Sequence, residues 1–206
     1  MSAPSILHPV PYYAQWESAA LVPEFITGQR DAADDPLWQK SGATDPQEYA
    51  FWAPRMCGVA CLRMALDYWR RPVPPSVPLV RELCEAGAYV RDGDQVKGLI
   101  YQPFAEHVRG RWSLQAESIP DLPAARVHEE VTGGRLVLLP VHKTIRTTDD
   151  DPPSKGGHLV LAVGVYEEGV MLHNPSGLPG VSQEAHRVPW ARLSRFYAGR
   201  GVVLGD

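Results

Sequence analysis

The sequence has no long hydrophobic run and no excess of basic residues. No window in its 206 residues approaches the roughly 20 apolar residues that a membrane span requires. The formal net charge is -4, with both signs interspersed along the chain, so the basic footprint typical of nucleic-acid or anionic-membrane binding is absent. We therefore expect neither nucleic acid nor a membrane among the partners.

Cysteine is also scarce, since the chain has three, an odd number that does not suit a disulfide framework. The first residues, MSAPSILHPVPYYAQ, have no basic start followed by an apolar run, so they do not resemble an export signal. Reduced thiols without an export signal are typical of a cytoplasmic protein, which is the location we expect. Neither paired CxxC units nor HExxH occurs, so we expect no zinc site and no cofactor.

Helical patterns fill the first half of the chain, and strand patterns fill the second. The composition, 44% hydrophobic and 21% charged, predicts one globular domain over residues 1–206. After an extended segment at 10–14, helices are predicted at 45–53, 57–69, 77–86, 95–108 and 124–131. Strands are predicted at 135–142, 158–165, 169–173 and 201–204, with a helical piece at 189–199 before the last. This order indicates an α+β fold with a hairpin that turns at the sequence EEG.

The stretch RMCGVACLRMAL, residues 55–66, places two cysteines one helical turn apart at the start of a predicted helix. Cys57 lies at the helix N-terminus, where unpaired backbone N–H groups stabilise a thiolate. Gly58 beside it has no side chain, which leaves room for a substrate. Cys61 lies one turn further in, and Cys84 lies on another helix, so both are expected to be packing residues. Cys57 is therefore the candidate nucleophile.

A thiol nucleophile needs a histidine to hold its proton and a third group to orient that histidine. His158 opens a predicted strand directly after the flexible Gly156–Gly157 pair, which could admit a substrate. Because the hairpin is antiparallel, Asn174 at the end of the second strand lies beside it. An asparagine carbonyl can accept the imidazole N–H. The other histidines are predicted near the terminus, on solvated helix faces, in a polar loop or on strands, at positions 8, 107, 128, 186, 142 and 173.

The remaining requirement is a pair of donors for an oxyanion, usually one backbone N–H at the nucleophile and one side chain. Gln15, at the end of the segment PVPYYAQ, is the candidate side chain. Trp16 follows it, and with Trp52 and Trp112 it is a candidate to line the substrate cleft, although aromatic residues more often lie in the core.

Four blocks in order, VPYYAQ, CGVACLRMALDYW, GGHLVLAVG and HNPSG, resemble the papain-like cysteine peptidases. They are more closely similar to the bacteriocin-processing, double-glycine leader peptidases and their stand-alone relatives. The resemblance implies a helical lobe packed on an antiparallel sheet, with the active-site cleft between them. It implies Cys57 as nucleophile, His158 as base, Asn174 as orienting residue and Gln15 with the Cys57 N–H as oxyanion hole. Substrate contacts are then expected at Trp16, Gly58 and Gly157.

The sequence departs from these relatives in two ways. The relatives place the glutamine a few residues before the cysteine, whereas here residues 16–56 intervene as an insertion that loops out, returns and could cover the cleft. The transporter-fused relatives also carry membrane spans and a nucleotide-binding domain. Since neither is found here, we do not expect secretion-coupled leader removal.

Several reactions remain open at such a site. We expect hydrolysis of a peptide or amide through a thioester acyl-enzyme. The same residues would serve an acyltransferase or cyclase in natural-product tailoring, on a small amide or thioester or on a carrier protein. A different class is a non-catalytic binding module that keeps the fold. A metal site formed by His142, His158 and His173 with Asp149–Asp151 is a weaker alternative because the spacing is irregular. The sequence does not indicate an oligomeric state.

Overall fold

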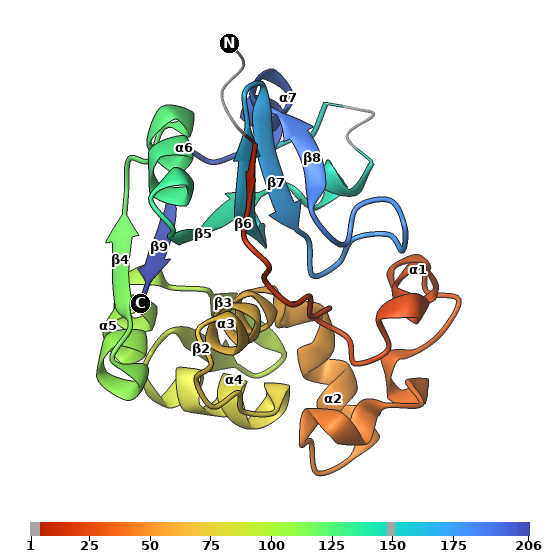
Figure 1. The fold of residues 1–206 in the computed structure, drawn as a ribbon. Coiled ribbons are helices and arrows are strands. Elements are labelled where there is room, and N and C mark those ends of the chain that lie inside the picture. The colour runs from red at the N-terminus through yellow and green to blue at the C-terminus, as the bar shows by residue number, and fades with distance from the viewer. Residues whose placement is uncertain (1–4, 148–150) are drawn as a thin grey trace.

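The computed structural model describes residues 5–147 and 151–206 and combines a helical layer with an antiparallel sheet (Figure 1). The strands of the sheet lie in the order β4-β9-β5-β6-β7-β8, and β1 pairs with β6. Their bounds are β1 Ile6–Leu7, β4 Gln115–Ile119, β5 Leu136–Val141, β6 His158–Tyr166, β7 Gly169–His173, β8 His186–Pro189 and β9 Gly201–Gly205. A separate hairpin joins β2 (Tyr89–Asp92) to β3 (Gln95–Gly98).

The two faces of the sheet are covered by different helices. Alternate side chains of a strand point to opposite faces, so Leu159 and Leu161 of β6 join the core that contains α3, while Val160 and Ala162 join the core beneath α6 and α7. Figure 1 shows α3 between the sheet and α4, with α2 near them and α1 further out. The helices are α1 Val22–Thr27, α2 Pro46–Trp52, α3 Cys57–Tyr68, α4 Ser76–Glu85, α5 Tyr101–Trp112, α6 Ala124–Thr132 and α7 Trp190–Phe196.

Local signals account for most of the predicted elements. The Asp45 side chain caps α2 by accepting the Glu48 N–H at 2.8 Å, and Pro46 opens the helix. The predictions for α2, α3, α4, α6 and α7 and for β5, β6, β7 and β9 are confirmed within a few residues at their ends. The hairpin is confirmed as well, because Tyr166 pairs with Gly169 across the predicted turn.

The predicted helix over 95–108 is wrong in its first half. Residues Gln95–Gly98 form β3, and the helix begins only at Tyr101. The reason is the two-residue turn Gly93–Asp94: Gly93 has φ +58°, and Asp92 pairs with Gln95 across the turn. Glycine with positive φ at the first central position is what a type II′ hairpin requires.

Three strands of the sheet, β1, β4 and β8, were not predicted, and β4 and β8 lie at its edges. Strand β4 reads QAESI and β8 reads HRVP, and neither has the apolar alternation on which strand prediction depends. His186, predicted in a loop, is the first residue of β8. The segment 10–14 is not a strand, and the N-terminal strand lies upstream at Ile6–Leu7.

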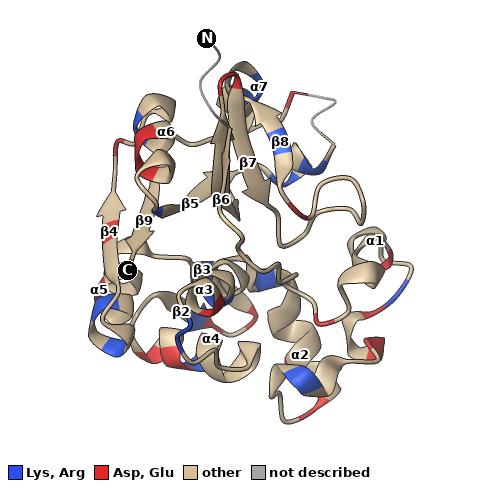
Figure 2. Ribbon diagram, in the orientation of Figure 1, with Lys and Arg blue, Asp and Glu red and all other residues tan. Residues whose placement is uncertain are grey.

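Acidic and basic residues occur on both the helical layer and the sheet, and α4 carries both signs (Figure 2). Among residues 5–147 and 151–206, no helix has the length and apolar content needed to cross a membrane.

Candidate active site

Cys57 is the first residue of α3 and follows a short 3-10 turn at Ala53–Arg55. Its side chain is half-buried, as is that of Cys84, whereas Cys61 is fully buried. Burial raises the pKa of the Cys57 thiol above its ordinary value, although the backbone N–H groups of Leu159, Gly58 and Cys57 itself act in the opposite direction. The helix N-terminus thus supplies the expected donors, but it does not produce a low pKa in the free protein.

His158 and Asn174 lie together at the end of the hairpin nearest α3. The imidazole Nε2 lies 2.8 Å from the Asn174 Oδ1, and both side chains are buried. Since an amide oxygen only accepts, Nε2 carries the proton of this bond. The other ring nitrogen, Nδ1, has no hydrogen-bond partner among the described residues. The pair therefore presents a neutral imidazole with one nitrogen available to accept a proton.

Burial lowers the pKa of His158 to about 4, with nearby Arg146 and His142 lowering it further and the bond to Asn174 opposing the change. At neutral pH the imidazole is therefore unprotonated. Together with the raised pKa of the Cys57 thiol, this gives a neutral thiol and a neutral imidazole in the free protein. Proton transfer between them then accompanies attack on a substrate.

This burial predicts that acid destabilises the fold through His158. Above pH 6.5 neither state binds a proton at this site, whereas between 6.5 and about 4 only the unfolded chain does, so stability falls as pH falls. From pH 7 to pH 4 the loss amounts to roughly 3 kcal/mol. Urea unfolding at several pH values should show this loss, and His158→Gln should lose roughly 3 kcal/mol less over the same interval. Equal losses in both proteins would contradict the assignment.

Ser176 and Arg146 complete the surroundings of His158, and the sequence did not indicate either. The Ser176 Oγ lies 3.1 Å from the His158 Nε2, and its backbone N–H donates to the Asn174 Oδ1 at 3.1 Å. Arg146 donates from Nε to the Ser176 carbonyl at 2.6 Å and from Nη2 to its Oγ at 2.9 Å. The turn after Asn174 is thereby held against the imidazole.

Two cavities meet at Gly157 and His158, which line both. The first, called the Cys57 cavity, has a volume of about 180 Å³ and is lined by Cys57, Gly98, Leu99, Tyr101, Pro140, Gly157, His158, Leu159 and Arg200. The second, called the Gln15 cavity, has about 300 Å³ and is lined by Gln15, Trp16, Phe25, Ile26, Pro54, Lys143, Arg146, Gly157, His158 and Ser176. A substrate that spans both would pass over the imidazole.

Gln15 is held at both its backbone and its side chain. Its N–H donates to the Pro175 carbonyl at 2.9 Å, and its Nε2 donates to the Ala53 carbonyl at 3.0 Å, just before Cys57. A primary amide has two N–H donors, so one remains available. The side chain is only 5% exposed, and its Oε1 has no partner among the described residues. The insertion thus begins and ends next to Gln15. Gln15 therefore lies beside the start of α3, although residues 16–56 separate it from Cys57 in the sequence.

The predicted substrate contacts differ in outcome. Trp16 and Gly157 line the cavities described above. Gly58 does not leave open space: a Cβ there would meet the Tyr89 hydroxyl at 3.0 Å and Leu99 and Leu159 side-chain atoms at 3.2 Å. The absence of a side chain at position 58 therefore permits packing of α3 rather than entry of a substrate, which corrects the expectation. Trp52 and Trp112 are buried in the core.

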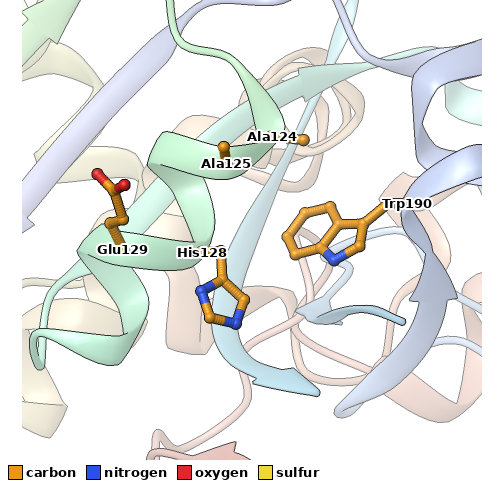
Figure 3. A pocket seen from close by; sticks show the side chains of 5 residues that line it. All are labelled: Ala124, Ala125, His128, Glu129 and Trp190. Carbon is orange, nitrogen blue, oxygen red and sulfur yellow. The ribbon is translucent and has the colours of Figure 1, made fainter. Parts of the chain in front are cut away.

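A larger cavity, of about 410 Å³, lies elsewhere, on the face of α6. Figure 3 shows Trp190 and His128 facing one another across it, with Ala124, Ala125 and Glu129 nearby. None of these five lining residues carries a thiol or a hydroxyl group. Because size alone does not supply a nucleophile, we place the candidate active site at the two smaller cavities.

The histidines proposed for a metal site are engaged separately. The His142 Nδ1 lies 2.8 Å from the Thr144 hydroxyl, and the His173 Nε2 lies 2.8 Å from the Val10 carbonyl. Asp149 and Asp150 lie outside the described residues. Within the described part of the chain, no group of three or more His, Cys, Asp or Glu side chains is placed to hold a metal ion.

Comparison with known proteins gives one family and several similar folds. The model of the Peptidase_C39 like family matches residues 8–201. The peptidase domain of Streptococcus ComA, a bifunctional ABC transporter of a quorum-sensing pathway, is 16% identical; the match covers 74% of this chain and 93% of that one, with a TM-score of 0.51. This likeness shows the fold and confirms the predicted α+β, papain-like class.

Two further solved structures have slightly lower TM-scores than the ComA peptidase domain. A C39-like peptidase from Bacillus anthracis is 12% identical, with 99% of this chain and 98% of that one covered and a TM-score of 0.49. A double-glycine-motif protease of an AMS/PCAT transporter, solved with its leader peptide, is 16% identical, with 73% and 84% covered and a TM-score of 0.47. No curated protein matched the chain.

Proposed function

Since this chain belongs to the Peptidase_C39 like family, and so has a cysteine peptidase-like function, we propose that it hydrolyses a peptide or amide bond through Cys57, His158 and Asn174. The observation that carries the proposal is the buried bond between the His158 Nε2 and the Asn174 Oδ1, at 2.8 Å, beside a cavity that Cys57 and His158 both line. This arrangement orients the imidazole and leaves Nδ1 for the thiol.

In the proposed reaction the Cys57 sulfur attacks the substrate carbonyl while His158 takes the thiol proton at Nδ1. The oxygen of the tetrahedral intermediate accepts hydrogen bonds from the Cys57 N–H and from the Gln15 Nε2. His158 then gives the proton to the departing nitrogen, and a thioester remains on Cys57. Water then adds to this thioester with His158 as base. The acyl part leaves as a carboxylic acid, and the Cys57 thiol is restored.

We further propose that residues 1–206 act as one domain and that the insertion forms one side of the substrate cleft. Tyr49 and Trp52 of the insertion belong to the same core as α3 and β6. Phe25 and Ile26 of α1 line the Gln15 cavity together with His158. The insertion therefore borders the space next to the imidazole, where it restricts which substrates fit.

Digestion of a proteome-derived peptide library in H₂¹⁸O tests the proposed reaction. We expect new C-termini that carry one ¹⁸O, because water resolves the thioester, and no such products from Cys57→Ser. An added amine acceptor distinguishes the alternative of acyl transfer, which would give new amides without label. A protein that binds library peptides but yields neither product is a binding module, and this result would contradict the proposal.

A further inference from the structure

Among the residues that the structure describes, the Gln15 cavity is lined by two cationic side chains and by no acidic one. Lys143 is exposed at its rim, and Arg146 is half-buried. Both come from the 3-10 turn Lys143–Arg146, which follows β5. A cavity with two positive charges and a low-dielectric wall attracts an anion.

Arg146 is held in place without being neutralised by a described carboxylate. Its Nε and Nη2 donate to Ser176, whereas Nη1 has no hydrogen-bond partner, and the residue forms no ion pair, among the described residues. Asp151, the described acidic residue nearest in sequence, pairs with Arg195 instead. A guanidinium fixed by two of its nitrogens keeps N–H donors in a geometry that suits a carboxylate.

The apolar side chains that line the Gln15 cavity come from the insertion. Trp16 stacks on Phe25 with ring centroids 5.8 Å apart, and Ile26 lies beside them on α1. The buried Gln15 Oε1, which lacks a partner among the described residues, adds one hydrogen-bond acceptor. A volume of about 300 Å³ is at the lower limit for small-ligand sites. The cavity therefore suits one or two residues with an apolar body, a hydrogen-bond donor and a negative charge.

The position of the cavity decides which part of a substrate enters it. This step rests on the proposed function. The acyl part of the substrate becomes bonded to Cys57, so it occupies the cavity that Cys57 lines. The departing part receives its proton from His158, so it occupies the cavity that His158 lines without Cys57.

We propose that Lys143 and Arg146 bind a carboxylate on the departing part of the substrate, within one or two residues of the cleaved bond. Two sources offer this chemistry. One is the terminal carboxylate of a short departing group, and the other is an acidic side chain directly after the cleaved bond.

Two pairs of peptides that share the best acyl part from the library distinguish these sources. In the first pair the departing group is leucine in one peptide and leucine amide in the other. In the second pair it is a longer, amidated segment that begins with Asp in one peptide and with Asn in the other. Wild-type protein should prefer the charged member of one pair by roughly tenfold in kcat/KM, the ratio expected for a charge-assisted hydrogen bond.

Lys143→Glu should abolish this preference, because it places a negative charge at the rim of the cavity. Lys40→Glu is the matched control and should keep the preference, since Lys40 is also exposed but does not line either cavity at His158. Equal cleavage of both members of each pair by wild-type protein would overturn the inference and leave the proposed function standing. Cleavage of no peptide at all would remove the proposed function itself, and the inference with it.

Discussion

We expect Cys57→Ser to lower kcat/KM on the best library peptide by at least about 10⁴-fold. A serine hydroxyl ionises far less readily than a thiol, so it depends more heavily on the base beside it. Burial lowers the pKa of His158 to about 4, and this makes the imidazole too weak a base for the hydroxyl. The measurement is initial-rate kinetics by mass spectrometry, with thermal unfolding to show that the variant is folded.

Cys61→Ser is the matched control for this result. Cys61 lies one turn further along α3, fully buried, with its sulfur 3.8 Å from the Leu159 carbonyl. A serine there can donate to the same carbonyl, so we expect turnover within a few-fold of wild type. If Cys57→Ser keeps normal turnover, or if Cys61→Ser loses it, Cys57 is not the nucleophile.

The sequence was most informative where one element determines a residue's position. Helix α3 is apolar around most of its surface. Strands β6 and β7 are joined by a tight turn, so their antiparallel pairing follows from local spacing, although its register shifts between Ala162 and Gly164. Cys57 at a helix start and His158 and Asn174 at the open end of a hairpin were found for this reason. The edge strands β4 and β8 have no such pattern, and only their pairing with β9 and β7 makes them strands.

Features that depend on tertiary packing were missed or predicted wrongly. Arg146 and Ser176 meet across 30 residues of sequence, and nothing in either local segment indicates the contact. The room beside Gly58 is filled by residues of other elements. The direction of the Cys57 pKa shift depends on how deeply α3 is buried, because desolvation competes with the helix N-terminus. The insertion and its expected position over the cleft followed from the spacing of the four blocks, but the residues that it contributes to the Gln15 cavity, Phe25 and Ile26, did not.

Gln15→Ala should lower kcat by about 10²- to 10³-fold with little change in KM. The proposed role is to donate from Nε2 to an oxygen that becomes negative only in the transition state. An interaction that exists only in the transition state affects kcat and not ground-state binding. The structure supports this role because the amide is pinned to the Ala53 carbonyl, four residues before Cys57, so no rearrangement of the side chain is needed during the reaction.

A purely structural role for Gln15 predicts a different result, and Gln183→Ala separates the two. Gln183 is also buried, and its Nε2 donates to the Ala19 carbonyl of the insertion at 2.8 Å, but it does not line either cavity at His158. Each alanine variant removes one hydrogen bond from a backbone carbonyl that keeps another donor, the Met56 N–H at Ala53 and the Val22 N–H at Ala19. Each should therefore cost about 1 kcal/mol in unfolding free energy. If Gln15 only ties the insertion to α3, both variants will lose similar stability and neither will lose kcat. A loss of kcat confined to Gln15→Ala identifies the glutamine as the second oxyanion donor.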